Sequence, residues 1–261
     1  MKKNSTLWII ACLLTVSSAY YQRRTGPTYA VREDVRLGGQ SYRLKLDRSH
    51  GSTGDQPVTL QIPDQDVQGQ LVWRFYPSQD PWQSLPLQRK GDTLEAYLPK
   101  QPPTAKLEYQ VQLTRSGEQI TIPARPAITR FKREVPNIVL YPHILAMFFG
   151  MLLATRAGLE ALADREQVRP MTLYTFLLLF FGGLFLGPVV QKLAFGSWWT
   201  GIPFGYDLTD NKTLIAVAAW AWALIRQRSG SRARWSVLWA AIITMVVFAI
   251  PHSVWGSELQ R

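Results

Sequence analysis

Four long apolar runs in the second half of the chain constrain its fold more than any other feature. They extend approximately over residues 136–155, 171–193, 209–225 and 235–255, and short charged links separate them. An apolar run of about 20 residues crosses a bilayer as an α-helix, because a helix satisfies its backbone hydrogen bonds within lipid. The sequence therefore predicts a four-helix transmembrane domain over residues 135–261, with an outer loop at residues 194–212.

The N-terminal segment carries an export signal. A basic start precedes an apolar core at residues 7–16, and the small residues Ser17 and Ala19 follow it. This pattern fits a signal peptide cleaved after Ala19, and it also fits a short uncleaved anchor over residues 1–21. Tyr20 and Tyr21 extend the apolar run towards the interface, so we favour the anchor. Either alternative sends residues 22–134 across the membrane.

The exported segment alternates apolar and polar residues with a period of two. The pattern is clear in QLVWRFYP, in DTLEAYLP, and in LEYQVQL, which places Leu107, Tyr109, Val111 and Leu113 on one face. Turn clusters separate about seven such segments between residues 28 and 133. We expect a mixed fold, an antiparallel β-sandwich plus an α-helical transmembrane bundle. The only cysteine, Cys12, precedes the sandwich, so its core must hold without a disulfide.

Residues 69–122 resemble an immunoglobulin-like or fibronectin type III-like domain. The resemblance rests on the V-W-R-F-Y strand, the W-Q-S-L-P-L segment, the E-A-Y-L-P strand and the L-E-Y-Q-V-Q-L strand before a glycine turn. It implies a fold that is used mostly for contact and spacing, and it names no ligand. The membrane half resembles no characterised family.

The export signal predicts the orientation, and charge agrees with it only in part, because TRFKRE at residues 129–134 is also basic and would lie outside. The link at residues 226–234, RQRSGSRAR, holds four arginines and no acid, as cytoplasmic links prefer. We therefore expect a multi-pass protein of the bacterial inner membrane with its soluble domain in the periplasm. The net charge of +11 is spread over loops and strands. It suits the lipid bilayer as a partner better than nucleic acid.

The outer loop, FGSWWTGIPFGYDLTDNK, holds more aromatic residues and glycines than a plain connector needs. Trp198, Trp199, Phe204 and Tyr206 suit the headgroup zone, and the glycines and proline between them allow tight turns. We predict that these four aromatic residues form an interaction surface for the sandwich, another membrane or periplasmic protein, or a small ligand.

The two aspartates of the loop and two lysines beside it have structural interpretations. We expect Asp207 to cap the following helix and Asp210 to be the acidic member of a capping box. Lys192 and Lys212 are expected to reach the membrane interface with their ammonium groups. In the link after residue 155, Glu160 and Asp164 are expected to lie on a solvated helix.

Two histidines predict an alternative function. His143 and His252 each follow a proline, and they stand roughly 20 Å and 27 Å from the inner ends of their helices at 1.5 Å per residue. Both therefore belong to the outer leaflet, where they could ligate haem b from two sides or join Asp207 or Asp210 around a transition metal. The competing interpretation is ordinary hydrogen bonding to loop carbonyls or headgroups.

Other catalytic templates are missing from the sequence. It holds no P-loop, GxSxG, HExxH or CxxC motif. The preferred hypothesis is a non-catalytic inner-membrane protein whose sandwich and aromatic loop form a docking or assembly surface in an envelope complex. The alternative is a haem b or metal-binding membrane redox protein that uses His143 and His252.

Overall fold

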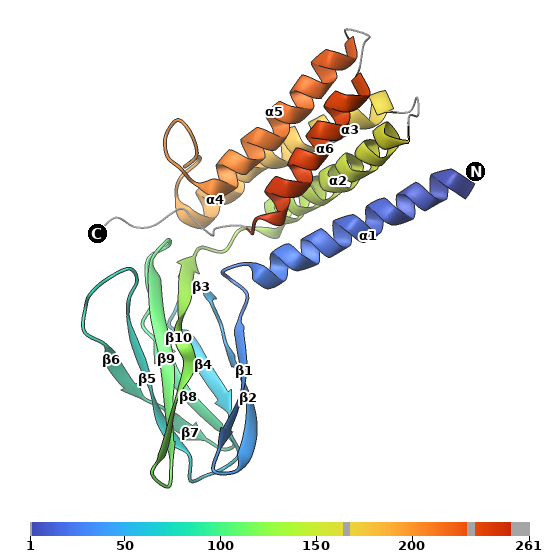
Figure 1. The fold of residues 1–261 in the computed structure, drawn as a ribbon. Coiled ribbons are helices and arrows are strands. Elements are labelled where there is room, and N and C mark those ends of the chain that lie inside the picture. The colour runs from blue at the N-terminus through green and yellow to red at the C-terminus, as the bar shows by residue number, and fades with distance from the viewer. Residues whose placement is uncertain (1, 164–167, 229–232, 252–261) are drawn as a thin grey trace. The chain divides into compact units, whose positions relative to one another are not determined.

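The chain forms two compact units in the computed structural model (Figure 1), which describes residues 2–163, 168–228 and 233–251. The helical unit comprises residues 2–26 and the described residues from 135 onward, and the β unit comprises residues 27–134. The structure thus contains a β-rich region with antiparallel sheets, together with helices.

The β unit contains ten strands, more than the seven or so that alternation predicts. They are β1 (Val31–Leu37), β2 (Gln40–Leu46), β3 (Ser49–Gly51), β4 (Gln56–Gln61), β5 (Gln68–Phe75), β6 (Gln83–Pro86), β7 (Gln88–Lys90), β8 (Thr93–Leu98), β9 (Lys106–Arg115) and β10 (Glu118–Lys132). The additional strands β3, β6 and β7 have three or four residues, too few to show a period of two.

Three sheets share these strands. One has the order β3-β10-β9-β5-β6, the second has the order β4-β8-β7, and β1 pairs with β2 in a hairpin. All pairs are antiparallel except β3 with β10, which is parallel. In the β4–β8 pair, Val58 lies opposite Ala96 and Leu60 opposite Leu94, so apolar side chains of both strands fall on one face.

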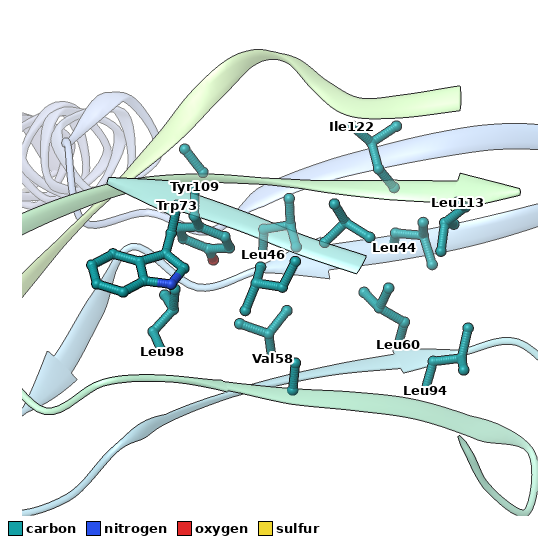
Figure 2. Close-up of a cluster of buried hydrophobic side chains, with 14 of the residues drawn as sticks. Leu44, Leu46, Val58, Leu60, Trp73, Leu94, Leu98, Tyr109, Leu113 and Ile122 are labelled. Carbon is teal, nitrogen blue, oxygen red and sulfur yellow. The ribbon is translucent and has the colours of Figure 1, made fainter. Parts of the chain in front are cut away.

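One hydrophobic core serves all of these sheets (Figure 2). Leu44 and Leu46 of the hairpin meet Leu60 of β4 and Trp73 of β5 in the same buried cluster. The prediction for β9 is confirmed, because the four side chains of its apolar face, Leu107, Tyr109, Val111 and Leu113, are all fully buried. The buried hydroxyl of Tyr109 donates to the carbonyl of Asp47 at 2.7 Å, which satisfies its polar atom within the core.

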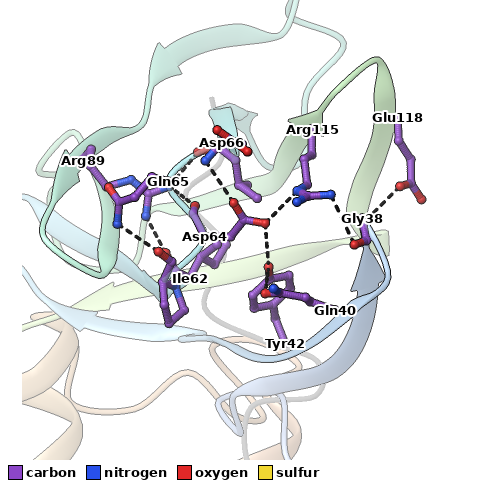
Figure 3. A network of polar contacts seen from close by, with 12 residues as sticks. Gly38, Gln40, Tyr42, Ile62, Asp64, Gln65, Asp66, Arg89, Arg115 and Glu118 are labelled. Atoms are coloured by element: carbon purple, nitrogen blue, oxygen red, sulfur yellow. Dashed lines mark hydrogen bonds and ion pairs between the residues drawn. The ribbon is translucent and has the colours of Figure 1, made fainter.

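A polar network closes one end of this core (Figure 3). Asp64 forms an ion pair with Arg115 at 2.6 Å, and the hydroxyl of Tyr42 donates to the Asp64 carboxylate at 3.5 Å. Arg115 also donates to the carbonyl of Gly38 at 3.2 Å, while the Gly38 amide donates to Glu118 at 2.9 Å. Burial raises the pKa of the Tyr42 phenol, and the charge of Asp64 raises it further.

The helical unit contains six α-helices and one π-helix among the described residues. They are α1 (Lys2–Thr25), α2 (Asn137–Leu162), α3 (Val168–Leu179), the π-helix η1 (Phe180–Leu186), α4 (Gly187–Phe195), α5 (Leu208–Arg228) and α6 (Ala233–Ala249). The elements α3, η1 and α4 follow one another without a break.

Two helices in the described residues are long and apolar enough to cross a membrane. These are α2, and the continuous helix Val168–Phe195 formed by α3, η1 and α4. The segment Arg234–Ala249 of α6 is a shorter apolar helix. At 1.5 Å per residue the two long helices measure roughly 40 Å, more than the ~30 Å hydrocarbon core of a bilayer.

Candidate functional site

The aromatic loop, residues 196–207, joins α4 to α5 in the helical unit. At its start, Gly196 has a left-handed φ of 89°, which suits a residue without a Cβ. The Gly196 amide donates to the carbonyl of Lys192 at 2.9 Å, and the Lys192 ammonium donates to the carbonyl of Gly196 at 2.7 Å. These two bonds fix the direction in which the chain leaves α4.

Asp210, in the first turn of α5, holds the aromatic loop in place. Its Oδ2 atom accepts hydrogen bonds from the Thr200 amide at 2.6 Å, from the Thr200 hydroxyl at 3.1 Å and from the Gly201 amide at 3.0 Å. Oδ1 of Asn211 accepts from the Ile202 amide at 2.8 Å. A Cβ on Gly201 would lie 2.7 Å from Asn211 Oδ1, so this close approach requires glycine. The start of α5 therefore binds three consecutive amides of the loop.

Asp207 begins α5 as the sequence predicts. Its Oδ1 atom accepts a hydrogen bond from the amide of Thr209 at 2.7 Å, which confirms the N-cap. The capping-box prediction for Asp210 is wrong, because its carboxylate binds loop amides and the Asp207 amide donates to the carbonyl of Thr200 instead, at 3.0 Å. The Asp210 carboxylate thus accepts from the loop, and the Asp207 amide donates to it, so the start of α5 is bonded to the loop through both an acceptor and a donor.

Four apolar side chains of the aromatic loop are largely exposed. Their exposed fractions are 57% for Trp198, 55% for Ile202, 81% for Phe204 and 89% for Tyr206. Trp199 differs from its neighbour, because it is half-buried and its indole donates to the carbonyl of Ile202 at 3.1 Å. Three of the four predicted interaction residues thus project from the loop, while Trp199 supports its backbone.

His143 of α2 is bonded to the π-helix. Its Nδ1 atom lies 2.8 Å from the carbonyl oxygen of Gly182, which also accepts the amide of Gly187 within η1. Since a carbonyl can only accept, Nδ1 carries the proton of this bond, and Nε2 is the nitrogen with the lone pair in the neutral ring. Short π-helical segments occur frequently at functional sites. The arrangement gives His143 a fixed orientation.

Two cavities border His143 and Met147. The first, of about 160 Å³, brings three of the predicted site residues together, namely His143, Asp207 and Asp210, and Gln191 also lines it. The second, of about 230 Å³, has mostly apolar walls from α1, α2 and α6. In the first cavity η1 packs closely on α5, because a Cβ on Gly183 would lie 2.4 Å from the Thr213 methyl.

Lys212 does not reach the membrane interface, in contrast to its prediction. It is buried, and its ammonium donates to the carbonyl of Ile250 at 2.7 Å. This carbonyl follows the end of α6, directly before Pro251, where helix carbonyls lack partners within the helix. A cation there also complements the negative end of the helix dipole. Lys212 therefore stabilises the end of α6.

The predicted metal or haem site is described only in part. His252 lies outside the described residues, and His50 belongs to the β unit, where its ring packs in a T-shaped arrangement with Phe131. Within the described ranges, no cluster of three or more histidine, cysteine, aspartate or glutamate side chains could hold a metal ion. A site that includes His252 stays a prediction.

The sequence analysis missed a buried ion pair near the other end of α2. Arg156 and Glu160, four residues apart, form an ion pair and are 0% and 1% exposed. Arg156 also donates to the side chain of Asn4 in α1 and stacks on the ring of Trp8 at 5.1 Å. The expectation of a solvated Glu160 is therefore wrong, and Asp164 lies outside the described residues. The spacing of Arg and Glu in an apolar run was the available signal.

Comparison with protein-family models, with curated proteins and with solved structures found no match to this chain.

Proposed function

We propose that this protein is a non-catalytic, multi-pass protein of a bacterial inner membrane that binds another envelope protein through the aromatic loop and a periplasmic β unit. The observation that carries the proposal is the pairing of four exposed apolar side chains with a loop backbone that Asp210 and Asn211 hold. A mobile loop would lose conformational entropy on binding, whereas a held loop loses less. Exposed tryptophan and tyrosine are also common anchors of protein interfaces.

The helix directions support a shared outer side for the loop and the β unit. Gln22, near the end of α1, bonds to carbonyls at the end of α6, and so does Lys212, near the start of α5. His143, near the start of α2, lines one cavity with the ends of α1 and α6 and another with the start of α5. The chain therefore leaves the helical unit for the β unit at the same helix ends where the aromatic loop lies.

The finer features of the fold belong to the same proposal. Side chains of the β4–β8–β7 sheet and of the five-stranded sheet fill one core, which supports a two-layer, immunoglobulin-like sandwich. In this proposal α5 and α6 are the other two spans of a multi-pass topology, beside the two helices of membrane length. The arginines at residues 226–234 favour the cytoplasm for that link, and hence the periplasm for the β unit.

A photoreactive amino acid at position 204 tests the docking proposal in living cells. We expect a discrete protein adduct whose yield falls at least about tenfold with Trp198→Ala, since anchor residues contribute about 2 kcal/mol or more. The matched control places the photoreactive group at position 239, because Trp239 of α6 is 55% exposed and lies far from the loop in the sequence. Adducts with lipid alone at both positions would refute docking. An adduct of twice the chain mass would identify a second copy as the partner.

A second candidate function, haem b or metal binding, is favoured by one observation at His143. The bond from Nδ1 to the Gly182 carbonyl leaves Nε2 as the ligating nitrogen, and such a second bond is usual for metal-binding histidines. His143 would be one ligand and His252 the other, with Asp207 or Asp210 as further metal ligands. A visible spectrum and metal analysis of the purified protein test this directly. The bound species should vanish in both His143→Ala and His252→Ala, whereas a colourless, metal-free protein contradicts it.

A further inference from the structure

The helix α1 packs into the helical unit along one stripe. Ala11 and Thr15 are buried and Ala19 is partly buried against the same apolar core, so every fourth residue of this stripe is small. Cys12 and Leu13, between them, are exposed. Small residues at this spacing let two membrane helices approach closely. A targeting sequence that is removed after export has no need of such a face.

One end of the stripe supplies two partners to a buried charge. The guanidinium of Arg156 is fully buried, and besides Glu160 its partners are the Asn4 amide oxygen and the Trp8 ring. Both of the latter belong to α1. Without α1, this guanidinium would lose those two partners, and an incompletely paired buried charge is costly.

The other end of the stripe bonds the end of α6 and lines a cavity beside His143. The side-chain amide of Gln22 donates to the carbonyl of Phe248 at 2.7 Å, at the end of α6 where helix carbonyls need outside partners. Ala19 and Gln22 also form a wall of the 230 Å³ cavity that His143 borders.

We infer that α1 is a retained helix of the mature protein and that it forms one wall of the cavity beside His143. Cleavage after Ala19 would remove the two α1 partners of Arg156 and most of the packed stripe, and it would open the cavity. The inference is independent of docking, because it rests on contacts within the helical unit alone.

The first test is the N-terminal sequence of the full-length protein isolated from membranes of a Gram-negative host. Retention predicts peptides that contain Asn4 and Trp8 in the same amount as peptides from the β unit. A protein that begins at Tyr20 would overturn the inference.

The second test asks whether α1 stays bound without its covalent link. A specific protease site is inserted after Gly26, the protein is cut in mild detergent, and the C-terminal part is captured through a tag. We expect α1 to remain with it, and we expect Asn4→Leu with Trp8→Leu to release α1. The matched control Leu13→Ala, on the exposed face, should leave α1 bound. Release of α1 from the otherwise unchanged protein, or equal retention in all variants, would contradict the role of Arg156.

Discussion

Replacing Asp210 with alanine tests the geometry of the aromatic loop most directly. The change leaves the amides of Thr200 and Gly201 without their acceptor, at a place where Asp210 is only 7% exposed. Each orphaned buried group costs about 1–3 kcal/mol, so the two amides together cost roughly 2–6 kcal/mol. The cost falls on the closed loop, and the rest of the helical unit should stay folded.

Chymotrypsin cleavage after Phe204 or Tyr206 measures this cost. When loop opening is fast, the cleavage rate follows the open population, and 2 kcal/mol corresponds to about a thirtyfold increase. Asp210→Asn keeps one acceptor oxygen and should increase cleavage less. Asp207→Asn is the matched control, because asparagine caps a helix about as well as aspartate and should leave the rate nearly unchanged. Equal cleavage of Asp210→Ala and the unchanged protein would refute the proposed clamp.

Three further predictions concern the ion pair and the β unit. Glu160→Leu should lower the free energy of unfolding in detergent by about 3–5 kcal/mol, because it leaves the buried charge of Arg156 unpaired. Adding Arg156→Met should recover most of this loss, because an apolar pair costs less than an unpaired buried charge. Equal stability of the single and double variants would contradict this. Residues 27–134 alone should give a β spectrum and a cooperative thermal transition, since one core serves all their sheets; a disordered spectrum would be the opposite result. Burial raises the pKa of Tyr42 above its unfolded value of about 10, so its contribution to stability is complete below pH 10 and is lost as the pH rises towards the folded pKa. Tyr42→Phe should therefore make the unfolding free energy less sensitive to pH above about 10, and an unchanged slope would count against it.

The longer strands were predictable and the short ones were not. In β9, residues 107–113 alternate strictly enough to identify the buried face, and the structure buries its four apolar side chains completely. The strands β6 and β7 have no such pattern, because their pairing follows from β5 and β8 bringing partners alongside them. Short strands are set by tertiary pairing, which a local period does not report.

In the candidate site, contacts between residues close in sequence could likewise be predicted, whereas contacts between distant residues could not. The N-cap at Asp207 is a local feature and could be read from two residues of sequence. The bonds of Asp210 to Thr200 and Gly201 cross a turn of about ten residues, so they depend on how the loop folds back. The contact between Arg156 and Asn4 joins residues 152 positions apart, and no spacing rule reaches that far.

The buried ionisable groups of the helical unit share a structural role, which narrows the place where a ligand could act. Asp210 holds the aromatic loop, Lys212 holds the end of α6, and Arg156 holds α1. Each buried charge thereby offsets part of its cost in a membrane by bonding a loop, a helix end or a neighbouring helix. His143 differs, because in the described part of the chain it bonds through Nδ1 alone and borders two cavities. A small ligand or metal, as distinct from a protein partner at the aromatic loop, is therefore to be sought first at His143, and variants at Lys212 and Arg156 should change stability before they change its binding.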